Sequence, residues 1–271
     1  MLVARPPTPP LNEYVACLWY AAGNALSHHR ERVLPTGTLD IVFQLGDEPI
    51  QVFGHEHDAI GKRLGRAVVA GAQSRYFVLP TSQQSQVAGI HFRPGGAARF
   101  LAAPLSEITD QHVDLEDIWG REAIELRQRL LEAASPTALS ALLEQALLRR
   151  IRDPEASYPA AIRSAELFAA NPSLARIRQV SDSTGCSPKR FIRMFHDAIG
   201  LTPKLYCRVK RFQALLDEIA LGGRIEWAKV ALDCGYYDQS HMIRDFRAFA
   251  GITPQAYRPV EAGRKNHVAI S

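Results

Sequence analysis

The chain has 271 residues, of which 46% are apolar, and its formal net charge is +4. These values are typical of a globular protein with room for two domains. The lack of a long apolar run argues against a membrane span, and the lack of a signal-peptide core argues against a secreted chain. The absence of C-x-x-C pairs argues against a thiolate metal site. We therefore expect a cytoplasmic protein whose four cysteines are reduced.

Residues 12–93 show the pattern of a β-rich domain. Short runs of β-branched and aromatic residues are separated by turn residues such as Gly46-Asp47 and Gly71, as is typical of strands. The predicted strands lie within residues 14–20, 39–45, 50–53 and 87–92. Many short strands favour a sandwich or a small barrel.

From residue 95 onward the pattern becomes helical. Helices are predicted at 97–102, 121–134 and 136–151, and the last of these follows Ser135-Pro136, which suits an N-cap with proline at the first helical position. The polar, proline-containing segment 152–159 is the predicted linker. We expect a multidomain α+β chain, with a β-rich domain over residues 1–156, a helical extension of it at 95–151, and an all-α domain over residues 157–271.

The all-α domain contains an internal repeat. The nine residues from Ser187 to Phe195 are echoed by those from Asp238 to Phe246, and glycine, proline and tyrosine follow each copy at the same spacing, with an offset of about 51 residues. Such regularity indicates two copies of one unit. Each copy begins with a helix-capping residue after a glycine turn, which is typical of a helix-turn-helix. We expect two such units, at about 174–200 and 225–251, among seven helices.

A long helix is predicted between the two units, from Thr202-Pro203 to about Ala220. At 1.5 Å per residue it would be roughly 28 Å long, which approaches the ~34 Å between successive major-groove faces of DNA. Such a spacer would let one monomer place two helices in adjacent grooves.

Positive charge is concentrated in the half that holds the repeat. Residues 1–158 hold 15 Lys and Arg against 18 Asp and Glu, about −3, whereas residues 159–271 hold 17 against 10, about +7. A surplus of cations on a compact helical domain is typical of proteins that bind the phosphate backbone. A solvated protein-interaction module is the alternative, and the matched repeat makes it less favoured.

Four-residue spacing assigns two faces to the second helix of each unit. The side chains predicted to face the core are Phe191, Phe195, Met242 and Phe246. The opposite face carries basic and amide groups. Arg193, Arg244 and Gln239 are the strongest base-reading candidates, because arginine can form two hydrogen bonds with guanine and glutamine can do the same with adenine.

Residues 159–259 resemble the AraC/XylS family of transcription regulators. The resemblance rests on residues 185–195, 200–206, 235–246 and 251–258. It implies that bases are contacted at Lys189, Ile192, Arg193, Gln239, Ser240, His241 and Arg244. Two departures stand out: Ser181 occupies a position where the family usually has alanine, as at Ala231, and Ile192 sits where a polar reader is common. We expect the first unit to read fewer bases than the second.

Phosphate contacts are expected near helix starts and on the basic connecting helix. The candidates are Ser187, Arg190, Lys204, Arg208 and Arg247. Lys210 and Arg211 lie on the same helix, and Arg211 has an alternative role in pinning the two units together.

The N-terminal half resembles a cupin-like domain of uncharacterised role that occurs in one branch of these regulators. The matching pieces are residues 35–43, 89–96 and 115–120. The resemblance implies a DNA-binding transcription regulator, not an enzyme, whose N-terminal domain senses a small-molecule effector, forms a homodimer, or does both. RNA polymerase is a further partner that the family implies. Neither the effector nor its binding residues follow from the sequence.

A different class of protein is the alternative. His55 and His57 form a His-x-His pair to which His91 could add a third imidazole, as in a cupin-type metal site. The chain would then be a small-molecule or metal-dependent enzyme with an appended helical binding module. The segment is turn-like and exposed histidines are ordinary, so we expect no metal, no cofactor and no catalytic residues.

The leucine-rich helices of residues 121–151 admit two interpretations, a dimer seam and packing onto the β-rich domain. The leucines concerned are Leu126, Leu130, Leu131, Leu139, Leu142, Leu143, Leu147 and Leu148.

Overall fold

The structure is a computed structural model that describes residues 2–23, 28–152, 158–172, 177–222, 225–261 and 263–270. Its strands are β1 (Leu2–Arg5), β2 (Val15–Ala22), β3 (Arg30–Val33), β4 (Asp40–Gln44), β5 (Gln51–Val52), β6 (Lys62–Arg63), β7 (Ala67–Ala70), β8 (Phe77–Pro80), β9 (Gln86–Phe92), β10 (His112–Asp114) and β11 (His267–Ile270). Its α-helices are α1 (Leu115–Trp119), α2 (Arg121–Leu131), α3 (Pro136–Arg150), α4 (Tyr158–Ala170), α5 (Ile177–Ser183), α6 (Pro188–Ile199), α7 (Pro203–Ala220), α8 (Trp227–Asp233) and α9 (Gln239–Ala250).

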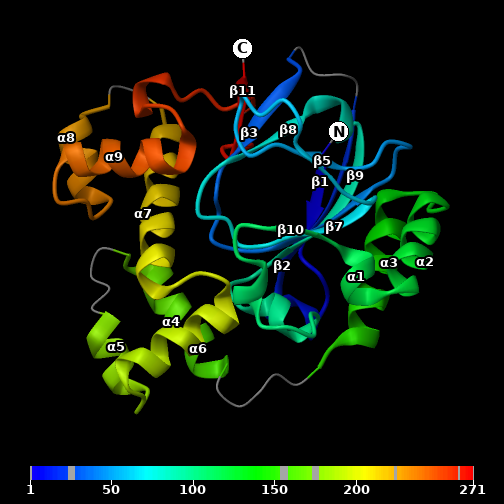
Figure 1. The fold of residues 1–271 in the computed structure, drawn as a ribbon, viewed down its shortest axis with the longest axis horizontal. Coiled ribbons are helices and arrows are strands. Elements are labelled where there is room, and N and C mark those ends of the chain that lie inside the picture. The colour runs from blue at the N-terminus through cyan, green and yellow to red at the C-terminus, as the bar shows by residue number, and fades with distance from the viewer. Residues whose placement is uncertain are drawn as a thin grey trace.

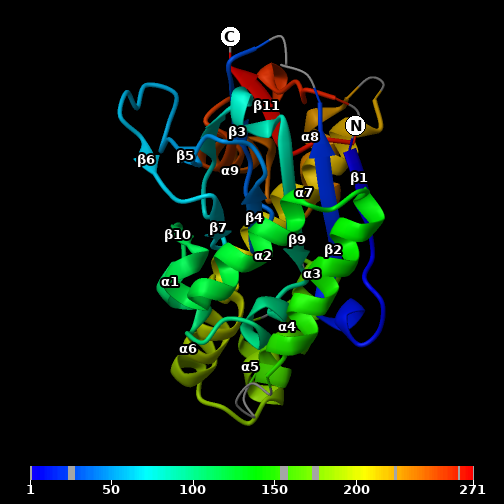
Figure 2. The same cartoon turned by 90° about the vertical axis from the view of Figure 1, so that its right-hand side faces the viewer.

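The β-rich part and the helical part lie side by side, with the strands on the right of Figure 1 and α5 to α9 on the left. The larger sheet has the order β1–β2–β9–β4–β7–β10, with antiparallel neighbours. Its central pair, β4 and β9, aligns the fully buried Ile41 and Ile90. Helices α2 and α3 contact β7 and β2 of this sheet, and both lie in front of it in Figure 2.

Most predicted strands and helices are confirmed. Strands β2, β4, β5 and β9 fall in the four expected runs, and α3 begins as expected, with the Ser135 hydroxyl accepting the N–H of Ala138. The segment 95–151, expected to be helical, contains strand β10, which pairs with β7. A three-residue strand is too short to show alternation in sequence, and its partner is about 40 residues away. Near residues 97–102 the chain forms only a 3-10 helix, Gly96–Arg99. The predicted linker and the boundary at 156 lie mostly outside the described residues.

The helical part follows the predicted order. Its described residues form six α-helices, α4 to α9, and the seventh expected helix is the short 3-10 helix Pro254–Ala256. The connecting helix α7 has 18 residues and is therefore about 27 Å long. None of the described helices is long and apolar enough to cross a bilayer.

The C-terminal segment leaves the helical part and returns to the β-rich part. Strand β11 pairs antiparallel with β3 over four residue pairs and so extends the sheet β11–β3–β8, which Figure 1 shows beside the C-terminus. The expectation that residues 157–271 form an all-α domain is corrected for this strand. The reason is physical: strand pairing depends on the distant partner, so the short run 267–270 gives no helical or strand period that points to β3.

A buried carboxylate secures this return. Glu31 on β3 is fully buried, and its oxygens contact Nε2 of His28 at 2.7 Å, Nδ1 of His267 at 2.8 Å and Nη2 of Arg264 at 3.2 Å. Gln84 donates a further hydrogen bond at 3.0 Å. Burial alone raises the pKa of Glu31, but the hydrogen bonds from His267 and Gln84 outweigh burial and lower the pKa to about 2. The ionised Glu31 therefore ties β11 and the segment before it to β3.

Replacing Glu31 by glutamine tests this link. Because the pKa of Glu31 falls from 4.5 to about 2 on folding, its charge stabilises the fold above pH 4.5 and loses that effect as the pH falls toward 2. We expect Glu31→Gln to lower the free energy of unfolding by about 2–3 kcal/mol at pH 7, measured by urea denaturation. The difference from the parent protein should shrink as the pH falls from 4.5 toward 2.

Glu48→Gln serves as the control, because Glu48 is exposed and makes no hydrogen bond or ion pair within the described part of the chain. A loss of stability for Glu31→Gln that is the same at pH 7 and pH 3, or equal to that of Glu48→Gln, would contradict the assignment.

Candidate nucleic-acid interface

The second helix of each unit, α6 and α9, begins with a side-chain cap and ends at a left-handed glycine. The Ser187 hydroxyl accepts the N–H of Arg190, and the Asp238 carboxylate accepts the N–H of His241. Gly200 and Gly251 close the helices with φ of +86° and +69°, a conformation that costs glycine little. We call α6 and α9 the recognition helices. Their starts and ends are set by local sequence signals that the repeat duplicates.

The inner face of each recognition helix is core. The four side chains predicted to face inward, Phe191, Phe195, Met242 and Phe246, have no exposed surface, so this prediction is confirmed. Phe191 packs against Phe195, and Phe246 packs against Phe212 of α7. Ser181 and Ala231 are both buried in the first helix of their units. The Ser181 hydroxyl lies 3.4 Å from the carbonyl oxygen of Cys186, so the departure from alanine places its polar atom against the turn.

The outer faces carry the predicted base readers, with differences between the two units. In α6 the side chains of Lys189, Ile192 and Arg193 are exposed. In α9, Ser240 and Arg244 are exposed, whereas Gln239 and His241 are half-buried. The His241 ring packs edge-on against Tyr236 and its Nδ1 lies 3.5 Å from the backbone nitrogen of Tyr237. His241 is thus partly engaged by its own turn.

The turn of the second unit is one residue longer than that of the first. Two steps lead from Gly185 to the cap Ser187, whereas three lead from Gly235 to the cap Asp238. The additional residue displays Tyr237, whose side chain is 86% exposed beside the start of α9. Sequence reasoning missed this side chain, and the signal was the extra aromatic residue immediately before the cap.

The cations of the connecting helix α7 have different environments. Arg208 forms an ion pair with Asp245 of α9, with Nη2–Oδ1 at 2.7 Å, Nε–Oδ1 at 3.2 Å and Nε–Oδ2 at 3.4 Å. The guanidinium of Arg211 lies 5.5 Å from the ring centre of Tyr236, in the turn of the second unit. Lys204 is exposed at the start of α7. The connecting helix therefore uses part of its charge internally.

Lys210 faces the β-rich part. Its Nζ donates a hydrogen bond to the carbonyl oxygen of Thr36 at 2.9 Å. Burial, and then the charge of Lys265, lowers the pKa of Lys210 to about 8. Gln213, one turn further along α7, donates to the carbonyl oxygen of Pro35 at 2.7 Å.

Both recognition helices are held at their C-terminal ends by the β-rich part. Near the end of α6, the hydroxyl of Thr109 donates to the carbonyl oxygen of Gly200, and the hydroxyl of Ser106 donates to Asp197 at 2.6 Å. At the end of α9, the backbone N–H of Tyr76 donates to the carbonyl oxygen of Phe249 at 2.9 Å. The two capped N-terminal ends remain exposed, with the cap side chains of Ser187 and Asp238 at the surface.

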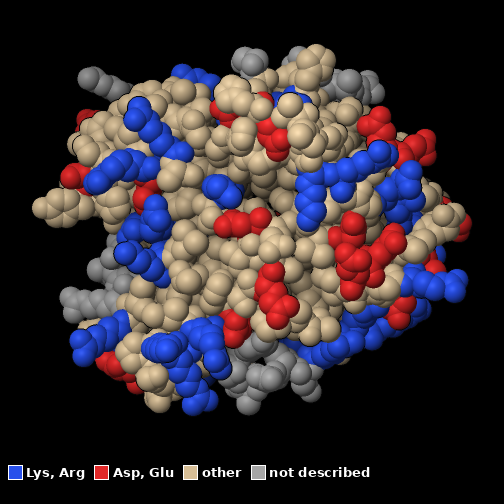
Figure 3. Space-filling view, in the orientation of Figure 1, with Lys and Arg blue, Asp and Glu red and all other residues tan. Residues whose placement is uncertain are grey.

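Positive side chains gather at the side of the molecule that carries these helices. Figure 3 shows Lys and Arg over α8 and α9 at the upper left and over α5 and α6 at the lower left. Exposed cations of the region include Lys189, Arg190, Arg193, Lys229, Arg244 and Arg247. This surface can attract a polyanion such as the phosphate backbone of a nucleic acid.

The three histidines of the metal hypothesis have different environments. His55 and His57 are exposed in a loop, whereas His91 pairs through Nδ1 with Asp40 at 2.9 Å and contacts the hydroxyl of Thr38 through Nε2 at 3.3 Å. Across the described residues, no group of three or more His, Cys, Asp or Glu side chains is arranged to hold a metal ion.

The leucines of α2 and α3 mostly pack inward. The buried ones are Leu126, Leu130, Leu139, Leu143 and Leu147. Only Leu131 and Leu148 of the set are exposed, at 42% and 45%, while Leu142 is half-buried. Packing onto the β-rich part, one of the two interpretations, accounts for the buried members.

Comparison with known families finds two matches along the chain. Residues 4–114 match the family described as "Domain of unknown function (DUF6597)", and residues 180–259 match the family described as "Helix-turn-helix domain". The second match begins in α5 and ends after the 3-10 helix Pro254–Ala256. It therefore spans both capped units.

Solved structures match most of the length of the chain, at low sequence identity. Among curated proteins no sequence matches the chain. Similar solved structures include ToxT from Vibrio cholerae at 1.65 Å resolution, with a TM-score of 0.48, 10% identity and coverage of 89% of this chain and 96% of that chain. ToxT from Vibrio cholerae bound to an unsaturated fatty acid gives a TM-score of 0.43 at 9% identity, covering 88% and 93%.

Substitutions of Arg208 and Lys204 compare a cation of α7 that is paired within the protein with one that is exposed. Arg208→Ala would leave Asp245, whose side chain is 6% exposed, without its arginine partner and with only Nε2 of His241, at 3.9 Å, beside it. We expect this change to lower the free energy of unfolding by about 2–3 kcal/mol. Lys204→Ala, at an exposed position on the same helix, should change it by less than about 0.5 kcal/mol. Chemical denaturation of both variants measures the contrast, and equal losses would contradict it.

Proposed function

We propose that this chain, which carries an AraC-type helix-turn-helix domain after a DUF6597 domain, is a sequence-specific DNA-binding transcription regulator. The observation that carries the proposal is the pair of capped recognition helices, each buried on one face and each exposing an arginine, Arg193 or Arg244, on the other. A helix of this kind fits the major groove, where arginine distinguishes guanine from the other bases.

The contacts to DNA divide into two groups. Base reading is assigned to Lys189, Ile192, Arg193, Gln239, Ser240, His241 and Arg244. Phosphate contact is assigned to Ser187, Arg190, Lys204, Arg208 and Arg247. Within the second group, Arg208 also pairs with Asp245, so it contributes less free charge than Lys204 and Arg247. Ser187 offers a neutral hydroxyl, which also caps α6. Tyr237 joins the set as a phosphate-contacting hydroxyl, because it is exposed beside the start of α9.

Control is assigned to the β-rich part. It contacts α7 through Lys210 and Gln213 and the ends of both recognition helices through Thr109 and Tyr76. A small-molecule effector that changes these contacts would change how the recognition helices meet DNA. The protein would act in the cytoplasm, where it would meet the chromosome and RNA polymerase.

Formation of a homodimer through the N-terminal half is a further part of the proposal. The surface available for it on α2 and α3 includes Ile124, Leu131 and Leu148, which are 51%, 42% and 45% exposed. The enzyme alternative is not favoured, because the helix-turn-helix match covers both repeats and His91 is engaged by Asp40 and Thr38.

Arg244→Ala tests base reading in the second unit. A selection from random duplexes first identifies the cognate site. We then expect the variant to lose about 1–3 kcal/mol of binding free energy on that site while non-specific binding changes little, because a base contact contributes only where its base is present. Fluorescence anisotropy at fixed salt measures both affinities.

The matched control is Arg63→Ala, on β6, because Arg63 is an exposed cation of the β-rich part whose side chain has no partner within the described ranges. It should leave both affinities unchanged. Equal weakening of Arg244→Ala on all duplexes would reassign Arg244 to a phosphate contact, and no preference of the parent protein for any duplex would overturn the regulator.

A further inference from the structure

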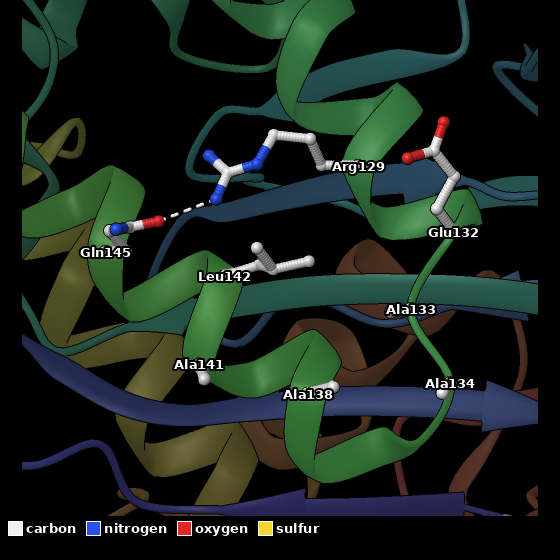
Figure 4. A pocket seen from close by; sticks show the side chains of 8 residues that line it. All are labelled: Arg129, Glu132, Ala133, Ala134, Ala138, Ala141, Leu142 and Gln145. Carbon is white, nitrogen blue, oxygen red and sulfur yellow. Dashed lines mark hydrogen bonds between the residues drawn. The ribbon is translucent and has the colours of Figure 1, made fainter.

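The β-rich part has a cavity next to the end of α9. Its volume is about 390 Å³, and its walls come from the loop after β5, from Lys62, from residues 73–77 and from residues 110–112. This volume is in the range of sites for small organic molecules. Another hollow, of about 570 Å³, lies between α2 and α3 and is lined largely by alanines (Figure 4). Helices α2 and α3 lie on the opposite side of the molecule from α8 and α9 in Figure 1.

The two carboxylates in the wall of the first cavity already accept hydrogen bonds from other groups of the protein. The carboxylate of Asp58 accepts the backbone N–H groups of Gly54, Ile60 and Gly61. The carboxylate of Asp110 accepts the N–H and the hydroxyl of Ser74. Neither carboxylate therefore needs a cationic ligand.

The basic groups of the same cavity have hydrogen-bond donors that are not used by other described residues. Arg75 is exposed and makes no hydrogen bond or ion pair with any described residue. Lys62 donates one hydrogen bond, to the carbonyl oxygen of His112, and its other two donors are free to bind a ligand. The Nε2 atom of His112 is buried without a partner in the described part of the chain. Burial, and then the charge of Lys62, lowers the pKa of His112 to about 4, so the ring is neutral at pH 7.

The remaining wall is apolar and aromatic. Val52 and Phe53 are 7% and 4% exposed, and the ring of Phe77 lies 4.5 Å from that of His112 in an edge-to-face arrangement. An aromatic or aliphatic body fits this wall. Free cationic donors beside an apolar wall suit a molecule with an oxyanion at one end.

Tyr76 connects the cavity to the second recognition helix. Its side chain lines the cavity, and its backbone N–H donates to the carbonyl oxygen of Phe249 in the last turn of α9. Its ring lies so close to Gly251 that an added Cβ there would stand 2.5 Å from Cε1 of Tyr76. The Tyr76 hydroxyl donates to Glu56 at 2.6 Å, and Glu56 pairs with Arg32 at 3.1 Å. A shift of Tyr76 therefore reaches the end of α9 directly.

We propose that this cavity binds a small organic molecule bearing a carboxylate, and that Tyr76 transmits its occupancy to the C-terminal end of α9. The carboxylate is bound by Arg75 and Lys62, with the apolar body against Phe53 and Phe77. The regulatory meaning of this site rests on the proposed function, whereas the binding itself does not.

Three probes with one ring and different ends test the binding. Phenylacetate, phenylacetamide and phenethylamine are titrated into the full-length protein without DNA and followed by ligand-observed NMR. We expect phenylacetate to bind at least about tenfold more tightly than the amide and the amine. Arg75→Ala should weaken phenylacetate about tenfold, and the control Arg63→Ala, a neighbouring exposed cation outside the cavity wall, should not. Equal binding of the three probes, or no binding of phenylacetate, would overturn the site.

Hydrogen exchange tests the transmission. Phenylacetate should change the exchange of amides in residues 247–251 and leave residues 196–200, at the end of α6, unchanged. In Tyr76→Ala, which removes the ring that lies against Gly251, exchange at 247–251 should no longer respond to phenylacetate at a concentration that saturates the variant. A response that persists in this variant, or that is equal at the two helix ends, would overturn the role of Tyr76. Loss of DNA binding in the parent protein would overturn the proposed function and leave this measurement unaffected.

Discussion

Both recognition helices end on backbone and hydroxyl groups of the β-rich part, and this attachment constrains the arrangement of the helical part. Thr109 donates to the carbonyl oxygen of Gly200, the cap that follows α6, and Tyr76 donates to that of Phe249 in the last turn of α9. Unpaired carbonyl groups at a helix end are costly when buried, so these bonds favour one position of each helix against the sheet. Because α7 separates the two units and is itself bonded to Thr36 and Pro35, the exposed N-terminal ends have their spacing defined by the β-rich part as well as by α7.

The contact between the β-rich part and the helical part combines buried apolar side chains with buried polar groups, each of which needs its hydrogen-bond partner close by. One continuous core contains Leu105 of the β-rich part together with Ile199 and Leu201 of the helical part. Within this contact, Gln213 is buried and Lys210 has its pKa lowered by burial. Apolar contact supplies most of the free energy, while each buried polar group requires its partner in place. Such an interface favours a small number of well-defined relative positions over continuous sliding.

Local signals made much of the helical part predictable. The caps Ser187 and Asp238, the glycines that end each recognition helix and the four-residue spacing of aromatic residues all act within one turn, so the sequence displays them directly. Contacts between distant segments were not predictable. Nothing near Tyr76 indicates that it meets Phe249, and the partner of β11 lies more than 200 residues away. For the same reason the sequence places Arg208 on a basic helix but does not reveal Asp245, which is buried in the second unit.

The pairing of β11 with β3 also means that the sheet β11–β3–β8 forms in two steps while the chain is being synthesised. Strand β3 leaves the ribosome early, pairs on one side with β8, and presents its other edge until residues 267–270 emerge. An open edge can pair with another chain, and Glu31 is uncompensated by Arg264 and His267 during that interval. Nascent or truncated chains that stop after the second unit therefore leave this edge of β3 open to other chains, and the sheet is completed only once the helical part has been translated.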